Sequence, residues 1–417
     1  MLRIVYPICC GLDVHKSMVF ACVASTNDKG VTTYKSHRFN TFTKGLRELA
    51  EWLKLHSCSD VCMESTGKYW IPVYNVLEHT CKIVLAHPKY VKAIRGKKTD
   101  KKDAKWIADI FKHDLVVGSF IPPLDIRQLR DLCRYRTKLV GFNTGEKNRV
   151  QNCLTVSNIQ LASVVSDVFG KSAADIINHL LENPMDTDFD FRPLLRTSLK
   201  DKADNIELAI DGVITPEQAE KMRIIFSHMK SLDLCKANLE SCILGIAEKY
   251  IPQINLVLTV PGIQSYSAIA IISEIGVDMS VFSTSKHLCS WAGLTPQNNE
   301  SAGKKKSVRI SRAGVYIKPL LVQCANAAIK SKKCPYFKNR YDQIKKRRGH
   351  KKAIIAIAHT LLNCIYHMLD KNETFNYDLY KIDSKPKQTY ASQITEEMAI
   401  RYLQTLGYQI PDMIRTT

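Results

Sequence analysis

The 417-residue sequence lacks the patterns that mark disulfide-stabilised, zinc-binding and membrane-spanning proteins. Its fourteen cysteines include no C-x-x-C pair, and most lie in hydrophobic surroundings, where a free cysteine acts as a small apolar residue. The first residues show no apolar region with a signal-peptide cleavage site, and no run of eighteen apolar residues occurs. We therefore expect free thiols, a reducing cytoplasmic location and no membrane partner.

Acidic residues are scarce in one part of the chain. The sequence has 60 Lys and Arg against 40 Asp and Glu, a net charge of +20 and a pI of about 9.3. Between Lys304 and Lys352 there are seventeen basic residues and one acid, Asp342, so this stretch alone carries +16. A solvated helix face usually mixes both signs, so this one-sided excess favours nucleic acid as a partner.

The first 122 residues predict a layered α/β domain. Apolar or alternating runs at 3–14, 18–25 and 31–39 predict three consecutive strands. Helix and strand patterns then alternate, at 46–53, 60–63, 69–77, 81–86 and from Asp100 onward. This order implies a mixed sheet covered by helices, and it matches the ribonuclease H-like fold.

The remaining sequence predicts mostly helix. Residues 123–250 carry an apolar stripe from Met222 to Ile246 that suits a coiled coil, or equally a helix packed within its own domain. The tetrapeptide Thr215-Pro-Glu-Gln predicts a helix start, with a capping residue, Pro at the first helical position and Gln at the third. Residues 251–385 predict a mainly helical C-terminal domain, in which Val260-Pro-Gly-Ile263 is similar to a helix-hairpin-helix turn. Residues 386–417 predict an amphipathic terminal helix.

Four acids lie where such a sheet brings carboxylates together. Asp13 interrupts an apolar run toward the end of the first strand, and Glu64 directly follows the fourth strand. These strands are neighbours in a ribonuclease H-like sheet, so their carboxyl ends place the two side chains close together. Asp100 and Asp103 share one face at the start of the last helix. Helix capping and the helix dipole explain this last pair about as well, whereas an unpaired buried carboxylate at Asp13 is costly.

A cluster of carboxylates needs cations to offset repulsion and desolvation. Mg²⁺ prefers oxygen ligands and tolerates waters and phosphate oxygens, so the four acids predict a magnesium site, with Mn²⁺ as an alternative. Two such ions about 4 Å apart stabilise the attacking and leaving oxygens of a phosphodiester displacement.

Ordered motifs in both halves of the chain resemble one family, the insertion-sequence-110 transposases. The N-terminal motifs are Gly11-Leu-Asp13-Val-His15-Lys16, Met63-Glu64-Ser-Thr66-Gly67-Lys-Tyr69-Trp70 and Lys98-Thr-Asp100-Lys-Lys-Asp103-Ala. The C-terminal motifs are Val260-Pro-Gly-Ile263, Trp291-Ala-Gly-Leu-Thr-Pro296 and Glu300-Ser301-Ala-Gly303. The resemblance runs from about residue 8 to about residue 370.

This resemblance implies a RuvC-like catalytic domain whose acidic DEDD set falls on Asp13, Glu64, Asp100 and Asp103. It places the catalytic serine at Ser301, with a transient phosphoserine link to DNA in a composite site shared between protomers. It also implies a structured noncoding guide RNA, a homodimer or homotetramer, and a bacterial, nucleoid-associated protein. Without the resemblance, Ser301 reads as an ordinary loop serine, since serine is favoured in turns.

The chain departs from the family pattern after the serine. Members often have a Gly-Asn pair followed by Arg, whereas this chain reads Arg312-Ala-Gly314-Val315-Tyr-Ile-Lys318. We therefore carry over no role to Val315 or Lys318.

Basic residues around and beyond the serine predict nucleic-acid contacts that weaken steeply with salt. The predicted contact residues are Lys304, Lys305, Lys306, Arg309, Arg312, Lys345, Lys346, Arg347, Arg348, Lys351 and Lys352. Tyr336, Phe337 and Tyr341 could stack on bases, although core packing is expected for at least two of them.

The sequence thus predicts a Mg²⁺-dependent transposase or recombinase of an insertion sequence, acting on double-stranded DNA at the element ends and the target. One alternative is a site-specific DNA invertase of the same superfamily. A second is a structure-selective RuvC-like endonuclease that uses water and leaves Ser301 idle. The third is a nucleic-acid-binding protein with a decayed site, which the presence of all four acids disfavours.

Overall fold

The computed structural model of the chain describes residues 2–65, 67–87, 91, 99–184, 189–296, 299–301, 304–307, 309–380 and 405. The chain divides into two compact units, Met1–Arg127 and Gln128–Thr417. The predicted terminal helix at 386–417 lies, except for Thr405, outside the described residues.

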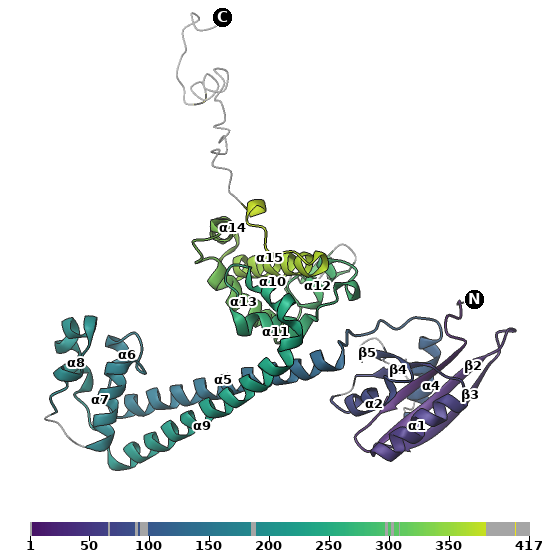
Figure 1. Ribbon diagram of the computed structural model, residues 1–417, viewed down its shortest axis with the longest axis horizontal. Coiled ribbons are helices and arrows are strands. Elements are labelled where there is room, and N and C mark those ends of the chain that lie inside the picture. The colour runs from purple at the N-terminus through teal and green to yellow at the C-terminus, as the bar shows by residue number, and fades with distance from the viewer. Residues whose placement is uncertain are drawn as a thin grey trace, which may run out of the picture. The chain divides into compact units, whose positions relative to one another are not determined.

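A mixed five-stranded sheet forms the centre of the first unit (Figure 1). Its strands are β1 (Ile8–Val14), β2 (Met18–Thr26), β3 (Thr32–Asn40), β4 (Asp60–Glu64) and β5 (Lys82–Ala86). The order is β3-β2-β1-β4-β5, in which β1 to β3 form an antiparallel meander and β4 and β5 run parallel to β1. The predicted mixed α/β sheet is confirmed, and β1 and β4 are neighbours at its centre.

Helices cover both faces of this sheet. Successive side chains of a strand point to opposite faces, and both faces carry apolar residues that need to be buried. Cys10, Leu12 and Val14 of β1 pack with the buried leucines of α1 (Thr43–Leu55) and with α2 (Trp70–Leu77). Cys9, on the opposite face of β1, packs with residues of α4 (Asp100–Phe111) that include Ile107. The alternation places β1 residues with odd numbers under α4.

The second unit is mainly helical among its described residues. Its α-helices are α5 (Leu124–Val156), which begins in the first unit, α6 (Leu161–Val164), α7 (Lys171–Glu182), α8 (Ala203–Ile210), α9 (Pro216–Ala247), α10 (Ile251–Leu258), α11 (Ser265–Ile275), α12 (Ser285–Trp291), α13 (Ile317–Ala328), α14 (Pro335–Arg348) and α15 (His350–Lys371). Short 3₁₀ turns are η1 (Arg192–Leu194), η2 (Thr197–Lys202), η3 (Glu248–Tyr250), η4 (Met279–Val281) and η5 (Asp378–Tyr380). A small hairpin of β6 (Asn299–Ser301) and β7 (Lys304–Ser307) completes the described elements.

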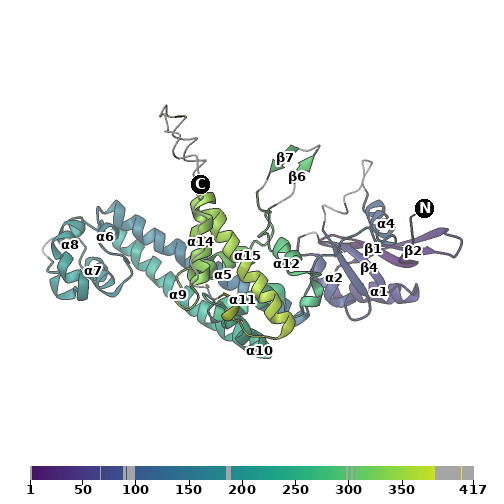
Figure 2. The same cartoon turned by 90° about the horizontal axis from the view of Figure 1, so that it is seen from above.

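The long helices α5 and α9 lie side by side and antiparallel (Figures 1 and 2). Three side-chain contacts join them in sequence: Arg136 to Glu240 at 2.7 Å, Asn143 to Asp233 at 3.1 Å, and Glu146 to His228 at 2.9 Å. Helices α6 to α8 pack with one end of this pair around a shared apolar core.

The apolar stripe predicted on α9 is only partly buried. Met222, Ile225, Met229 and Leu232 are buried, and so is Ile243, whereas Leu239 is half-buried. The predicted helix start is confirmed, because α9 begins at Pro216 directly after Thr215. Thr215 is the N-cap residue, but its hydroxyl donates to the Glu217 carboxylate at 2.7 Å and caps no backbone amide.

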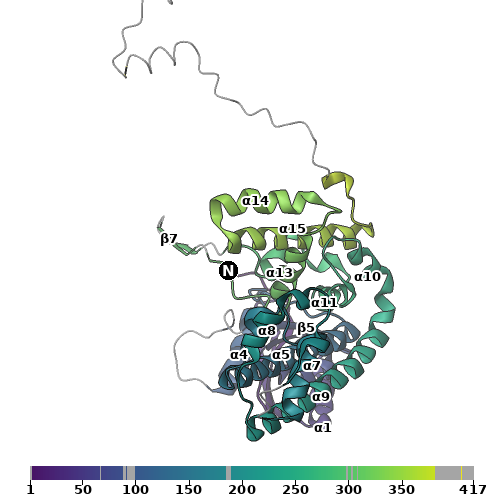
Figure 3. The same ribbon diagram turned by 90° about the vertical axis from the view of Figure 1, so that its left-hand side faces the viewer.

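The last helices pack around α15, which contacts α13 and α14 along its length (Figure 3). Of the helices in the described part of the chain, α15 has the length and mean hydropathy of a membrane span, and 61% of that apolar window is buried inside the protein. A core helix has the same properties. Between α10 and α11, the turn requires glycine at Gly262, which has φ of +85° and where a Cβ would lie 2.4 Å from the Ala328 amide of α13.

Candidate metal centre and serine hairpin

Asp13 and Glu64 lie at the carboxyl ends of two adjacent parallel strands. Asp13 is the sixth of the seven residues of β1, and Glu64 is the last residue of β4. The register pairs Leu12 with Met63, so the next position along each strand brings Asp13 beside Glu64. This is the juxtaposition that the ribonuclease H-like topology predicted.

The helix α4 lies directly on the face of β1 that carries Asp13. A Cβ atom at Gly11 would come within 2.2 Å of the Ala104 carbonyl oxygen and 2.4 Å of the Ala108 amide. Glycine at this position therefore permits the close approach of the α4 backbone to the strand. The first turn of α4, with its two acids, is thereby held against the same face of the sheet.

Asp100 and Asp103 occupy the first turn of α4, as the sequence predicted. The N-cap residue is Thr99, whose hydroxyl accepts a hydrogen bond from the Lys102 amide at 3.4 Å. Capping therefore does not explain Asp100, which is the first helical residue. The helix dipole still favours both acids at this position.

One residue that was not predicted joins this site, His15. Its Nε2 atom lies 3.1 Å from Asp13 Oδ2 and 3.6 Å from Asp100 Oδ1. In the described part of the chain, Asp13, His15 and Asp100 form a group whose ligand atoms all lie within 4.8 Å of one another. Glu64 and Asp103 stand outside that group. The signal for His15 was the Asp-x-His spacing, which puts both side chains on one side of an extended segment.

Burial dominates the electrostatics of Asp13, whose side chain is only 13% exposed. Loss of solvent raises the pKa of its carboxyl above the ordinary value. The charge and the hydrogen bond of His15 act in the opposite direction, and the charges of Asp100 and Asp103 raise the pKa further. The site thus places two further acids close enough to disfavour ionisation of the Asp13 carboxyl.

The donor set fits a divalent cation. Two neighbouring ligands of an octahedral ion at about 2.1 Å are roughly 3 Å apart, which is close to the 3.1 Å between Asp13 and His15. The side chains of His15 and Asp100 are 42% and 39% exposed. The open side of the group therefore leaves room for waters or phosphate oxygens as further ligands.

Ser301 belongs to the second unit, where it ends β6 of the small hairpin (Figure 2). The expectation of a loop position is wrong, because Ser301 pairs with Lys304 of β7 and Asn299 pairs with Ser307. The side chains of Ser301, Lys304, Lys305 and Lys306 lie outside the described residues. The register nevertheless places Ser301 and Lys304 directly opposite each other at the last pair of the hairpin.

Two glycine-containing loops hold the base of this hairpin. Pro296 and Ile310 form an isolated antiparallel bridge. A Cβ at Gly293 would lie 2.4 Å from the Ala313 carbonyl oxygen, and one at Gly314 would lie 2.1 Å from that of Ala292. Lys318 closes the second loop, since its Nζ donates to the carbonyl oxygens of Ser311 at 2.7 Å and Ala313 at 2.9 Å. Lys318 thus has a structural contact that its sequence context did not predict.

The other predicted contact residues of the described chain are exposed. Arg309 and Arg312 lie near the hairpin base, and two groups flank Gly349, at the end of α14 and the start of α15: Lys345, Lys346, Arg347, Arg348, Lys351 and Lys352. Of the aromatic residues between them, Phe337 and Tyr341 are buried in the core. Core packing for two of the three aromatic residues is therefore confirmed.

Two family models match the chain. One, of the IS110 DEDD type and described as a transposase, matches residues 10–159. The other, described as the transposase IS116/IS110/IS902 family, matches residues 254–342. The first match includes all four predicted acids and His15, and the second includes Ser301 and its hairpin. A DEDD transposase domain indicates the use of a divalent metal.

The chain is also similar to curated bacterial proteins. It is 23% identical over 304 residues to the transposase for insertion sequence element IS1111A of Coxiella burnetii, which covers 70% of this chain and 72% of that protein. It is 23% identical over 390 residues to the pilin gene-inverting protein of Moraxella bovis, covering 89% of this chain and 98% of that protein. The Moraxella lacunata protein of the same name matches to the same extent.

Proposed function

The chain belongs to the IS110 family of transposases and is a DNA transposase or recombinase, and we propose that it mobilises an insertion sequence with a carboxylate-held divalent metal and a serine nucleophile. The observation that carries this proposal is the convergence of Asp13, His15 and Asp100 at one end of the central strands. The packing of the sheet does not require two carboxylates and an imidazole at this position, so a binding role is the better explanation for the group.

We propose that the first unit is a RuvC-like domain and that Asp13, Glu64, Asp100 and Asp103 are its metal ligands. The strand order β3-β2-β1-β4-β5 and the position of Asp13 beside Glu64 support this assignment. Mg²⁺, when bound, supplies positive charge to the non-bridging and leaving oxygens of a phosphodiester. The carboxylates would hold the ion, and α4 covers one side of the group.

The proposed role of Ser301 is nucleophilic. Its hydroxyl oxygen forms a bond to the DNA phosphorus while a bond from phosphorus to a deoxyribose oxygen breaks, and that oxygen takes up a proton as a hydroxyl. Attack by a deoxyribose hydroxyl on the phosphoserine then restores a phosphodiester and returns the serine proton. Because one phosphoester bond replaces another in each step, rejoining needs no external energy source. A position at the last pair of a hairpin, next to basic residues, supports access to a DNA backbone.

A trapping experiment tests the serine and the metal separately. A nicked DNA substrate bearing an element end should accumulate a covalent protein–DNA adduct in the presence of Mg²⁺. Ser301→Ala should form no adduct, whereas Ser307→Ala, on the opposite strand of the same hairpin, should form it normally. Asp13→Asn should retain DNA binding and lose the adduct. If Ser301→Ala cuts and rejoins DNA at the normal rate, the serine role is wrong. If it cuts at the normal rate but does not rejoin, water-dependent cleavage is the better description.

A second candidate function is site-specific inversion of a DNA segment. The similarity to pilin gene-inverting proteins over 89% of this chain favours it as strongly as the shorter match favours transposition. Both functions use the same chemistry. Sequencing the products of a reaction on a plasmid with two candidate sites separates them, since inversion conserves the intervening segment and transposition moves it.

We further propose double-stranded DNA and a structured guide RNA as the partners of the basic surface, in a homodimeric or homotetrameric assembly. The charge of the stretch from Lys304 to Lys352 supports a polyanionic partner of either kind. Sequencing the nucleic acid that co-purifies with the chain identifies which kinds are bound.

A further inference from the structure

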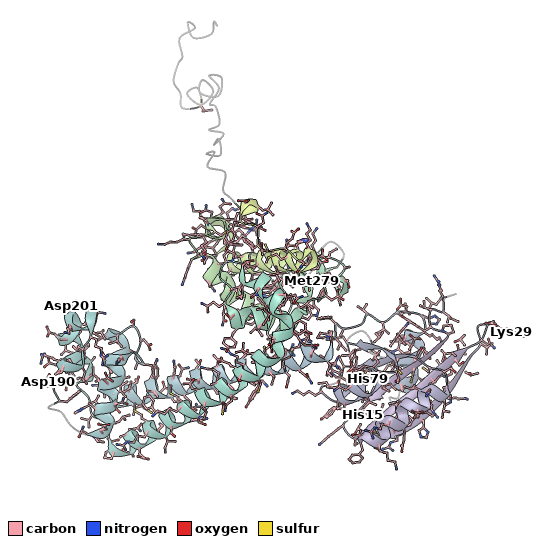
Figure 4. All side chains as sticks on the ribbon, in the orientation of Figure 1. His15, Lys29, His79, Asp190, Asp201 and Met279 are labelled. Carbon is pink, nitrogen blue, oxygen red and sulfur yellow. The ribbon has the colours of Figure 1, made fainter. Side chains whose placement is uncertain are left out.

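His15 is held at the carboxyl end of β1 by the turn into β2. Its backbone amide donates to the Met18 carbonyl oxygen at 2.9 Å, immediately after the last paired residues Val14 and Val19. It follows Asp13 by two residues in extended backbone, so it shares the α4 side of the sheet. Figure 4 marks its position in the first unit.

The imidazole Nε2 faces two carboxylates at once. It lies 3.1 Å from Asp13 and 3.6 Å from Asp100. A single N–H donates well to one acceptor, and 3.6 Å exceeds hydrogen-bond distance. Hydrogen bonding therefore accounts for the contact to Asp13 alone, and the approach of Asp100 to the same nitrogen needs another explanation.

We propose that His15 is a nitrogen ligand of the divalent ion held by Asp13 and Asp100, and that it shifts the site's preference from Mg²⁺ toward Mn²⁺. This inference rests on the proposed metal site and adds a ligand that the four-acid set does not contain. One oxygen from each carboxylate and Nε2 lie within 4.8 Å of one another, as three ligands on one side of a single ion do.

The chemistry of the donor decides the metal preference. Carboxylate, carbonyl and water oxygens suit Mg²⁺, whereas imidazole nitrogen suits transition metals. Replacing one oxygen by nitrogen in an otherwise oxygen-lined site therefore gives Mn²⁺ an advantage that a purely acidic site lacks. The half-exposed edge of the group still accommodates the waters or phosphate oxygens that either ion requires.

The opposite reading makes His15 a protonated counter-ion that occupies the place of a metal. The two readings differ in sign. A ligand strengthens metal binding, so its removal weakens binding. A competing cation opposes metal binding, so its removal strengthens binding.

The experiment measures Mn²⁺ and Mg²⁺ binding to the full-length protein without DNA. In His15→Ala, Mn²⁺ should bind about tenfold or more weakly, since loss of even an outer partner costs roughly 10- to 100-fold in affinity. Mg²⁺ affinity should fall by a smaller factor. The matched control is His79→Ala, which removes an exposed histidine of the same unit outside the site (Figure 4).

Pulsed electron paramagnetic resonance of bound Mn²⁺ provides a readout that does not depend on a variant. Protein labelled with ¹⁵N-histidine should show a directly coordinated nitrogen, and His15→Ala should lose it. The proposal is overturned if wild-type protein shows no nitrogen coupling, or if His15→Ala binds Mn²⁺ as tightly as wild type or more tightly. Asp13→Asn distinguishes failure of the proposed metal site from failure of the His15 proposal. If Asp13→Asn leaves Mn²⁺ affinity unchanged, the metal site itself is wrong. If Asp13→Asn weakens Mn²⁺ binding and His15→Ala does not, only the role of His15 is wrong.

Discussion

At the scale of single residues, Asp13 is a carboxylate whose charged form is destabilised by its surroundings. Its carboxyl is largely buried under α4 and lies near two further acids, Asp100 and Asp103. A position chosen for stability would carry an apolar or amide side chain here. Perturbed carboxyls of this kind concentrate at functional sites, where a bound cation offsets their cost.

The raised pKa of Asp13 predicts how stability depends on pH in the absence of metal. The folded pKa exceeds the ordinary value, so the folded state binds the proton more tightly than the unfolded state. Stability contributed by the protonated form is present near and below the ordinary pKa of about 4 and is lost as pH rises through the folded pKa. Asp13→Asn should therefore gain free energy of unfolding relative to wild type as pH rises to neutrality.

Urea denaturation in a chelating buffer at acidic and neutral pH measures this difference. Asp28→Asn, in the exposed turn between β2 and β3, is the control and should show no comparable trend. A difference between wild type and Asp13→Asn that stays constant with pH would contradict the electrostatic argument. Adding Mn²⁺ should favour wild type, because only the carboxylate binds the ion strongly.

At the scale of elements, one carboxylate joins α5 to α11. Glu274 is buried near the end of α11, with a side chain only 6% exposed. Its two oxygens accept hydrogen bonds from Arg134 at 2.7 and 2.8 Å. Arg130 donates to the backbone carbonyl oxygens of Ser273 and Glu274 at 2.9 and 2.8 Å. Two arginines of α5 thus bind the end of α11, where the helix leaves carbonyl groups unpaired.

Glu274→Gln should destabilise the protein, because it leaves the Arg134 guanidinium facing a neutral group. Breaking a buried pair costs about 3–5 kcal/mol. Arg134 is 37% exposed, so we expect a smaller loss, about 2 kcal/mol. The surface pair of Arg192 and Glu207, both more than half exposed, is the control, and Glu207→Gln should cost less than about 0.5 kcal/mol. Equal losses of unfolding free energy in the two variants would show that the buried Glu274 pair stabilises the protein no more than a surface pair does.

At the scale of the whole molecule, the excess of basic residues is concentrated in one stretch of the second unit. The candidate acids belong to the first unit, whereas the stretch that carries +16 of the net +20 belongs to the second. Within that stretch, the last turn of α14 presents Lys345, Lys346, Arg347 and Arg348 to solvent. Cations at a helix C-terminus are favoured by the helix dipole, but four in succession exceed what that effect requires.

Replacing these four residues by glutamine should weaken DNA binding and reduce its salt dependence. Each lost phosphate contact lowers the slope of log affinity against log salt by about 0.9, so the slope should fall by up to about 3.6. Fluorescence anisotropy with a labelled duplex over a salt series measures it. Lys29→Gln, in the exposed turn after β2, is the control and should leave the slope unchanged. An unchanged slope in the fourfold variant would place the DNA contacts elsewhere.

The order of strands and helices along the first unit and the start of α4 followed from the sequence alone, because hydrophobic periodicity marks each element. The adjacency of β1 and β4 was expected only because that order matches the ribonuclease H-like fold. The same patterns located Asp13, Glu64, Asp100 and Asp103 at the ends of those elements. Family motifs singled out Ser301 as the candidate nucleophile, but they did not show that it ends a strand.

Only the tertiary structure decided which side chains meet. His15 approaches Asp100 across 85 positions of sequence, and Arg134 reaches Glu274 across 140. Such contacts depend on how closely α4 packs at Gly11 and on the rotation of α5 against α11, which no local pattern encodes. Side-chain contacts escape prediction at short range too. The Thr215 hydroxyl donates to the Glu217 carboxylate, whereas an N-cap threonine is expected to accept from a backbone amide. Periodicity constrains the backbone, whereas a metal site or an ion pair depends on side-chain geometry between segments that are distant in the chain.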